Sequence, residues 1–260
     1  MFENKIITLL TDFGLSDVYV GVMKGVIAQT NPNLTTIDIT HQVPAQNLVA
    51  ARFCLMNAYC YFPQGTTHLA VVDPGVGSSR RAIAIKIAEG FLVGPDNGIF
   101  SGILHQSPAI AAVELTNFKY WRMQRSATFH GRYIFAPVAA HLASGVSLTD
   151  LGNEIDTTTL VNLAIPEVGS TNAQINGCIQ YIDTFGNLIT NIPGDRVYGK
   201  TWQVVAAGVE IPGCTTYSDQ TIGSLVALVA SHGWVEIAVN CGDARSQLSL
   251  QYLDPVQVLF

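Results

Sequence analysis

The stretch at 67–81, Thr-His-Leu-Ala-Val-Val-Asp-Pro-Gly-Val-Gly-Ser-Ser-Arg-Arg, joins an apolar run to groups that can do chemistry. The apolar residues predict a strand that ends at Asp73, and a turn with Pro74 and two glycines then leads to Arg80 and Arg81. A carboxylate, a cation and bare backbone N–H groups at a strand end are typical of the place where open α/β sheets bind ligands. A salt-bridged loop is the alternative, and this segment alone does not decide between them.

Two further motifs also follow apolar runs. Thr-Asp-Phe-Gly at 11–14 puts Asp12 at the expected carboxyl end of the first strand, where a carboxylate can accept both hydroxyls of a ribose. The alternative role of Asp12 is a helix N-cap. Gly-Pro-Asp-Asn-Gly at 94–98 presents Asp96 and Asn97, either to a ligand or within an ordinary turn.

Two more polar clusters lie later in the chain. Phe-His-Gly-Arg at 129–132 places the imidazole of His130 close to a guanidinium, although a satisfied core histidine would fit the same pattern. The stretch at 182–191 holds an acid, an aromatic ring and amides, which suit a purine and an ammonium group but also an ordinary hairpin. Its candidate ligand-binding residues are Asp183, Phe185 and Asn187.

Several chemistries find no pattern in the sequence. The six histidines lack metal-ligand spacing, and the five cysteines include no Cys-x-x-Cys pair, so neither a metal centre nor a disulfide framework is predicted. A Gly-x-Ser-x-Gly elbow and a phosphate-binding Gly-x-x-x-x-Gly-Lys loop are also missing. We therefore expect a polar site for an adenosine-like ligand, without metal or cofactor.

Composition restricts the class of protein. Of 260 residues only 12% are charged, and the mean hydropathy is +0.31, so we expect surface to be hidden in an oligomer. The net charge of −6 comes without a basic run, which argues against nucleic acid as a partner. Neither a signal peptide nor a membrane-spanning apolar run is evident, and the prediction is a cytoplasmic protein without a membrane partner.

The order of predicted elements indicates an α/β domain followed by a β domain. In residues 1–165, strands alternate with helices at 17–29, 48–61 and 135–144, which predicts a three-layer α/β domain with a largely parallel sheet. A Pro-, Gly- and Ser-containing linker is predicted at 166–172. Residues 173–260 read as short strands separated by turns, typical of a smaller, mostly β domain of barrel or sandwich type.

Taken in order, these motifs carry a family resemblance across nearly the whole chain. Together with Ser-x-Gly-x-x-Glu-Ile-Ala-Val-Asn at 231–240, they resemble the adenosine-forming S-adenosyl-L-methionine (SAM) hydrolases, also called SAM hydroxide adenosyltransferases. That family is related to the fluorinase and chlorinase enzymes. Each motif is weak alone, but the ordered set is specific.

The resemblance implies hydrolysis of SAM to adenosine and L-methionine, by attack of an activated water on the ribose 5′ carbon. It places water activation on Asp73, Arg80 and His130. It also implies a homotrimer, with the ligand between the α/β domain of one subunit and the β domain of its neighbour. The implied substrate contacts are Asp12 at the ribose, Asp183 at the methionine ammonium, Phe185 and Asn187 beside adenine, Ser231 near the methionine carboxylate, and Asp243 with Ala244 at the adenine edge. Asp96 and Asn97 are predicted to bind substrate as well, from their own motif.

The chain departs from the family pattern at a few positions, and two rival functions stay open. Tyr133 stands where the family usually has an acid, and the stretches around Ala230, His232 and Cys241 also differ. A SAM-dependent halogenase is one rival, which should lack the Asp, Arg and His set. A non-catalytic adenosine- or SAM-binding protein is the other, and it would not need Arg80 or His130.

Overall fold

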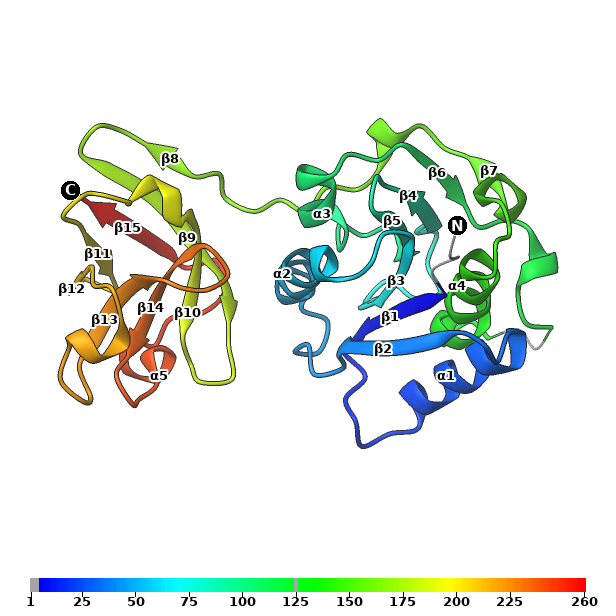
Figure 1. The fold of residues 1–260 in the computed structure, drawn as a ribbon, viewed down its shortest axis with the longest axis horizontal. Coiled ribbons are helices and arrows are strands. Elements are labelled where there is room, and N and C mark those ends of the chain that lie inside the picture. The colour runs from blue at the N-terminus through cyan, green and yellow to red at the C-terminus, as the bar shows by residue number, and fades with distance from the viewer. Residues whose placement is uncertain (1–4, 124–125) are drawn as a thin grey trace. The chain divides into compact units, whose positions relative to one another are not determined.

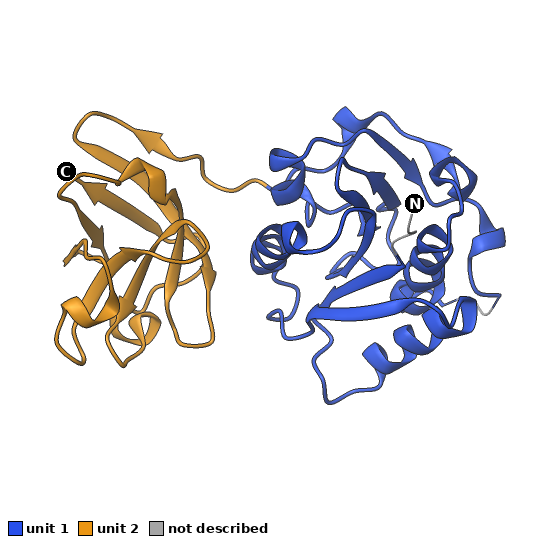
Figure 2. Ribbon diagram, in the orientation of Figure 1, with its two compact units in different colours: residues 1–163 blue, residues 164–260 orange. Residues whose placement is uncertain are grey.

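The computed structural model describes residues 5–123 and 126–260. The chain divides into two compact units, residues 1–163 and 164–260 (Figure 2). The predicted domain boundary at residue 165 lies beside this division. Within the described residues, the structure contains no helix that is both long and apolar enough to cross a membrane.

Unit 1 is built on a seven-stranded sheet with strand order β2-β1-β3-β5-β4-β6-β7 (Figure 1). Neighbouring strands are parallel from β2 to β5 and antiparallel from β5 to β7. The sheet is therefore mixed rather than largely parallel, because the short connection between β4 and β5 allows only a hairpin. The strands are β1 (Ile6–Thr11), β2 (Thr35–Thr40), β3 (Thr66–Val71), β4 (Ala82–Lys86), β5 (Gly90–Pro95), β6 (Ala111–Glu114) and β7 (Asn153–Glu154).

Helices cover both faces of this sheet, which confirms the predicted α/β class. Helices α1 and α4 pack together on one face, and α2 and α3 pack together on the other (Figure 1). The α-helices are α1 (Tyr19–Thr30), α2 (Leu48–Ala58), α3 (Ser101–Gln106) and α4 (Ala136–Ala143). Shorter turns are the 3₁₀ segments η1 (Tyr59–Tyr61), η2 (Phe118–Tyr120), η4 (Leu148–Leu151) and η5 (Thr157–Thr159), and the π-helical turn η3 (Gly131–Phe135).

The path of the chain opens a crevice at the ends of β1 and β3. From β1 the chain runs through α1 to β2, then returns through α2 to β3 on the other side of β1. The last residues of the two strands, Thr11 and Val71, are register partners. Because the connections leave toward opposite faces of the sheet, this is a topological switch point, where α/β folds bind ligands.

Unit 2 is an antiparallel, barrel-like sheet, which confirms the predicted smaller β domain. Its strands follow the order β12-β11-β15-β9-β10-β14-β13, with β8 beside β9, and a bridge between Gly213 and Ala227 nearly closes it. The strands are β8 (Gly169–Ser170), β9 (Gln174–Ile182), β10 (Leu188–Pro193), β11 (Gln203–Ala206), β12 (Val209–Pro212), β13 (Leu225–Val229), β14 (Trp234–Val239) and β15 (Pro255–Leu259). Its helical segments are η6 (Gly194–Arg196), η7 (Tyr217–Asp219) and α5 (Ala244–Leu248).

Candidate active site

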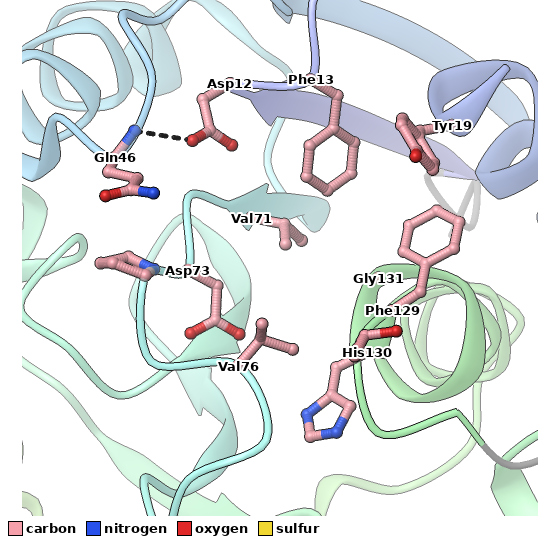
Figure 3. Close-up of a pocket in the computed structure, with 12 residues that line it drawn as sticks. Asp12, Phe13, Tyr19, Gln46, Val71, Asp73, Val76, Phe129, His130 and Gly131 are labelled. Atoms are coloured by element: carbon pink, nitrogen blue, oxygen red, sulfur yellow. Dashed lines mark hydrogen bonds between the residues drawn. The ribbon is translucent and has the colours of Figure 1, made fainter. Parts of the chain in front are cut away.

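A cavity of about 550 Å³ lies at the carboxyl ends of β1 and β3 (Figure 3). Its walls come from the turn after β1, the turn after β3, and the segment that leads into η3. Three of the motifs singled out from the sequence therefore meet at one place. The lining residues are Asp12, Phe13, Tyr19, Gln46, Val71, Asp73, Pro74, Val76, Thr128, Phe129, His130 and Gly131.

Asp12 follows β1 directly, as the sequence predicts, and its carboxylate lies at the cavity (Figure 3). The backbone N–H of Gln46 donates to its Oδ2 at 2.8 Å. Gln46 has a φ of +63°, an uncommon value for a residue with a side chain, and no sequence signal pointed to it. With one oxygen already anchored, the carboxylate keeps acceptor capacity for a ligand hydroxyl.

A chain of polar side chains, which begins at the buried residues Thr11 and His41 and ends at the surface, holds the turn that carries Asp12. The Oγ1 of Thr11 lies 2.8 Å from Nδ1 of His41 and accepts from the backbone N–H of Phe13 at 3.2 Å. The Nε2 of His41 lies 3.1 Å from Asp38 Oδ1, and Lys24 reaches the other oxygen at 2.7 Å. Burial raises the pKa of Asp38, but the contacts with Lys24 and His41 outweigh it and leave that pKa lowered.

The centre of the site is a nearly buried ion pair between Asp73 and Arg80. The side chains are 5% and 11% exposed. The Nε of Arg80 donates to both carboxylate oxygens, at 3.0 and 3.1 Å, and Nη2 donates to Oδ2. Between them, Ser78 braces the loop by donating from Oγ to Gly75 O at 2.7 Å and accepting from Arg80 N at 3.2 Å. The salt-bridged loop and the site are thus the same structure, and the bridge lines the cavity through Asp73.

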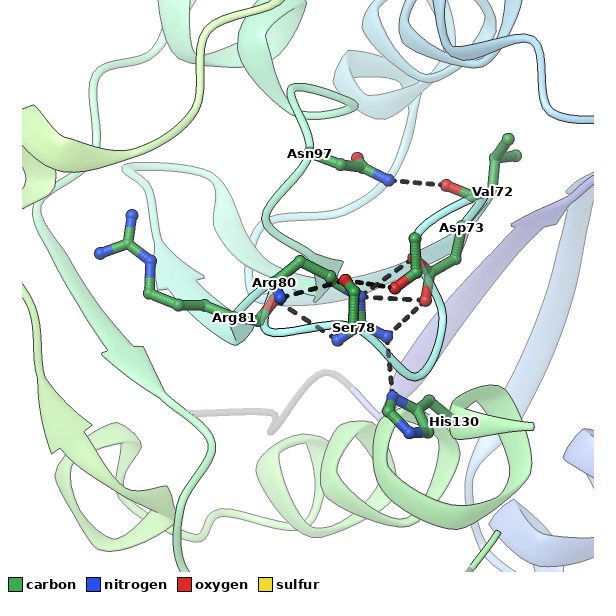
Figure 4. A network of polar contacts seen from close by, with 8 residues as sticks. Val72, Asp73, Ser78, Arg80, Arg81, Asn97 and His130 are labelled. Carbon is green, nitrogen blue, oxygen red and sulfur yellow. Dashed lines mark hydrogen bonds and ion pairs between the residues drawn. The ribbon is translucent and has the colours of Figure 1, made fainter. Parts of the chain in front are cut away.

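His130, which directly precedes η3, joins the ion pair (Figure 4). Its Nδ1 lies 2.8 Å from Nη2 of Arg80. Because a guanidinium only donates, Nδ1 must accept, and in the neutral ring the proton sits on Nε2. Burial lowers the pKa of His130, the charge of Arg80 lowers it further, and Asp73 opposes them, so the neutral form is favoured at pH 7. The structure thus brings together Asp73, Arg80 and His130.

The π-helical turn that follows His130 brings a second side chain, Phe135, into contact with Arg80. A π-helical turn places residues five apart above one another, and here both His130 and Phe135 contact Arg80. The guanidinium lies 5.3 Å from the ring centroid of Phe135, which is fully buried. Tyr133, a departure from the family pattern, is buried with its ring centroid 6.4 Å from that of His130.

Three aromatic rings form one side of the cavity. Phe13, Tyr19 and Phe129 contact one another edge to face, with centroid separations of 5.2 to 5.9 Å. Such a wall suits a flat apolar group such as a nucleobase, or a cation. These rings were not among the predicted site residues. Phe13 and Phe129 belong to motifs that the sequence analysis singled out, so only their role was missed. No sequence pattern pointed to Tyr19.

Asp96 and Asn97 do not line the cavity, which differs from their predicted role in binding substrate. Asp96 is 7% exposed, and its oxygens are taken by Arg81 and by the backbone N–H of Val161. The amide of Asn97 donates to Val72 O at 2.9 Å. Both side chains are therefore directed at the protein, and Figure 4 shows Asn97 bonded to Val72.

In unit 2, the predicted residues at 183–187 form a tight turn. Asp183 Oδ1 accepts from the N–H groups of Phe185 and Asn187, both at 2.9 Å, and Oδ2 accepts from Asn187 Nδ2 at 3.0 Å. Asn187 is 8% exposed, whereas the ring of Phe185 is 72% exposed. The turn thus presents an aromatic face beside an acid, as a ligand-binding loop would, and its ligand contacts remain predictions.

The other predicted unit 2 residues have mixed surroundings. Ser231 is exposed. Asp243 caps α5 by accepting from Ser246 N at 2.8 Å, which lowers its pKa together with the Ser246 hydroxyl. Ala244 is fully buried in the core of the unit, so its side chain is not available to an adenine, and only its backbone could serve that role.

Across residues 5–123 and 126–260, no group of three or more His, Cys, Asp or Glu side chains is placed to hold a metal ion. Of the polar groups at the cavity, Asp12 accepts from Gln46 N, and Asp73 and His130 both contact Arg80.

A switch-point cavity with a buried carboxylate, guanidinium and imidazole defines an α/β protein with an enzyme-type site. The chain belongs to the SAM hydroxide adenosyltransferase family. The model of that family's N-terminal domain matches residues 7–152, and the model of its C-terminal domain matches residues 177–257. The resemblance seen in the motifs is therefore confirmed.

Individual relatives agree with this assignment. The chain is 39% identical to an (R)-S-adenosyl-L-methionine hydrolase of Salinispora tropica, over 97% of each chain. It is 38% identical to one of Thermus thermophilus, over 96% of this chain and 98% of the relative. A fluorinase of an Actinoplanes species is 26% identical, over 91% of each. The crystal structure of a conserved protein from Thermotoga maritima matches with a TM-score of 0.91 at 36% identity, over 98% of this chain and all of that one.

Proposed function

We propose that this protein hydrolyses S-adenosyl-L-methionine to adenosine and L-methionine. The observation that carries the proposal is the Asp73–Arg80–His130 cluster, which lies at a cavity also lined by the Asp12 carboxylate and an aromatic wall. Membership of the family and the names of the relatives at 38 to 39% identity support it. The relatives' names specify the R form of the substrate, and we propose the same preference here.

In this reaction only the nucleophile needs to be activated by the protein. Water attacks the ribose 5′ carbon in line with the C–S bond, that bond breaks with its electron pair on sulfur, and the sulfonium becomes the neutral thioether of methionine. No acid is needed for this leaving group. The attacking water must lose a proton, so a cation beside its oxygen and a nearby base would lower the barrier, together by about 10²- to 10⁴-fold.

The cluster supplies both kinds of group. Arg80 is the cation, and the carboxylate of Asp73 and the imidazole of His130 are the available bases. Neutral His130 already accepts from Arg80 through Nδ1, which leaves Asp73 better placed to take the proton of a water in the cavity. Asp12 would hold the ribose hydroxyls, and the rings of Phe13 and Phe129 would face the nucleoside or the sulfonium.

A homotrimer would complete the site, in which unit 2 of a neighbouring subunit contributes Asp183, Phe185, Asn187 and Ser231. Two observations support this part of the proposal. In the segment between the cavity residues Phe13 and Tyr19, two apolar side chains are exposed, Leu15 at 65% and Val18 at 72%. In unit 2, the ring of Phe185 is 72% exposed. The predicted cytoplasmic location remains a prediction.

Assembly can be tested by complementation. Arg80→Ala and Asp183→Ala should each inactivate the protein, through different units. When the two variants are mixed, dissociated and reassembled, some sites would combine an intact unit 1 with an intact unit 2, and activity should return. Sedimentation gives the number of subunits. If mixing restores no activity although the subunits have exchanged, the proposal that two subunits share each site is wrong.

The reaction itself is tested with labelled water. Purified protein is incubated with each sulfonium epimer of SAM in H₂¹⁸O, with and without chloride or fluoride, and the nucleoside is analysed by mass spectrometry. The proposal expects ¹⁸O at the 5′ oxygen of adenosine, faster from the R epimer. A 5′-halo product would identify a halogenase, and tight binding without turnover would identify a binding protein.

A further inference from the structure

The turn after β5 touches both neighbours of the ion pair. Asp96 contacts Arg81, which follows Arg80, and Asn97 contacts Val72, which precedes Asp73. We propose that Asp96 and Asn97 are positioning residues, whose adjacent side chains fix the two ends of the loop at 73–80 and thereby set the geometry of the Asp73–Arg80 pair. This rests on the proposed function, since the consequence is a slower chemical step.

Asn97 works as a short bridge between two backbones. Its Nδ2 donates to Val72 O at 2.9 Å (Figure 4), and its Oδ1 accepts from Ile99 N at 3.2 Å. The side chain therefore ties the last peptide before Asp73 to the start of the segment that leads into α3. A side chain with both ends occupied in this way has little freedom to move.

Asp96 holds the other end of the loop. Its Oδ2 accepts from Arg81 Nε at 2.8 Å, its Oδ1 accepts from Val161 N at 2.9 Å, and its own N–H donates to Arg81 O at 3.0 Å. The Asp96 side chain is 4% exposed. Arg81 is further bound to Thr159. The backbone beside Arg80 is thus fixed on two sides.

The loop needs such support because of its own composition. Gly75 and Gly77 give the chain between Asp73 and Arg80 wide conformational freedom, and Gly77 has a φ of +82°. The supporting turn, in contrast, sits on the rigid sheet. At Gly94, near the end of β5, an added Cβ would collide with the carbonyl of Ala70 in β3, so the strand that leads into the turn lies directly against β3. The sheet, through this turn, dictates where both loop ends lie.

The consequence is a division of roles within the motif at 94–98. Neither side chain lines the cavity, so their loss should leave substrate binding almost intact. A shift of the reacting groups by about 1 Å can slow a reaction by about 10²-fold. The expected signature is therefore a fall in kcat with little change in KM.

Asn97→Ala is the direct test, with Asn117→Ala as its matched control. Asn117 makes the same pair of bonds, since its Nδ2 donates to Asp150 O at 2.7 Å and its Oδ1 accepts from Lys119 N at 3.2 Å. Both variants lose an equivalent bridge, but only Asn97 adjoins the ion pair. Asn97→Ser is the second variant, because a hydroxyl can still accept from Ile99 N if the alanine variant folds poorly.

Three measurements read the outcome: kcat and KM for SAM, thermal unfolding, and the titration of His130 followed by NMR. We expect kcat of the Asn97 variants to fall by about 10- to 100-fold. Their His130 midpoint should rise, because contact with Arg80 is weakened. Asn117→Ala should lose a similar amount of stability and change neither kcat nor the His130 midpoint.

If the Asn97 variants keep both the kcat and the His130 midpoint of the natural protein, the positioning role is wrong. Equal effects of the Asn97 and Asn117 variants would also overturn it, as a general loss of stability. The NMR titration is independent of turnover. If the natural protein does not hydrolyse SAM, the proposed function fails while the titration still decides whether Asn97 positions the cluster.

Discussion

Arg80 is the side chain that contacts the other main residues of the site. Its guanidinium donates to Asp73 on one side and to His130 on the other, and it rests over the ring of Phe135. A lysine has one charged nitrogen and cannot present this planar set of donors. The two bases of the site are therefore oriented by the same cation that would stabilise a developing hydroxide.

Arg80→Ala and Asp73→Asn should each lower kcat by at least about 10²-fold, because each removes a group that we propose acts on the water. Adenosine binding should weaken much less, because Asp12 and the aromatic wall are untouched. Steady-state kinetics and calorimetry with adenosine measure the two effects. Retained turnover in both variants would remove the water-activating role.

Activity should also have an acidic limb set by His130. The pKa of this imidazole lies below its ordinary value of 6.5, through burial and Arg80. Protonation would put a hydrogen on Nδ1 facing the guanidinium, so kcat should fall as pH drops through the His130 pKa. The midpoint of the kcat profile should match that of His130 measured by NMR. A midpoint well above 6.5 would assign the limb to another group.

At the scale of elements, the site is made by strand ends and the turns that hold them. The turn at 11–14 is fixed through Thr11 and His41, and the loop at 73–80 is supported from β5. The strands before Asp12 and Asp73 could be predicted because they are continuous apolar runs. The supporting contacts could not, because they join residues far apart in the sequence.

Thr11→Val tests the anchor of the first turn. Valine keeps the shape of threonine but leaves His41 Nδ1 and Phe13 N without their partner, which should cost about 1–3 kcal/mol of stability. Because the turn carries Asp12, KM for SAM should rise by about 5- to 10-fold, with a smaller change in kcat. Thr11→Ser keeps the hydroxyl and should restore KM. Identical KM values in the two variants would contradict the anchor role.

Helix boundaries near the site show a limit of sequence patterns. The expected helix at 135–144 is found as α4, Ala136–Ala143, but a π-helical turn precedes it. A period of 3.6 residues does not reveal a wider turn, and the spacing of His130 and Phe135 looks unrelated in an α-helix. The spacing is explained only by the tertiary structure, in which both side chains contact Arg80.

At the scale of the whole molecule, acid should destabilise unit 1 through His68. This residue of β3 is 1% exposed, and burial lowers its pKa to about 4. The unfolded chain takes up this proton near pH 6.5, so its contribution is complete above that pH and is lost as pH falls toward 4. The full change amounts to roughly 3 kcal/mol.

Denaturant unfolding at a series of pH values measures this dependence. His68→Asn keeps a polar atom near Nδ1, which lies 2.8 Å from Thr8 Oγ1, but cannot titrate. The variant should be less stable at pH 7 and show a shallower loss between pH 6.5 and 4. An unchanged slope in the variant would show that other groups carry the acid sensitivity.

The sequence by itself determined the class of the fold, the β character of unit 2 and the family, because these depend on local periodicity and on motifs that are contiguous in the chain. It also identified Asp73, Arg80 and His130 as candidate catalytic residues. Only the tertiary structure decided that Asp96 and Asn97 face the protein and that Phe13, Tyr19 and Phe129 share one wall. A motif shows which groups are present, whereas the direction of a side chain depends on distant neighbours that compete for its hydrogen bonds and its burial.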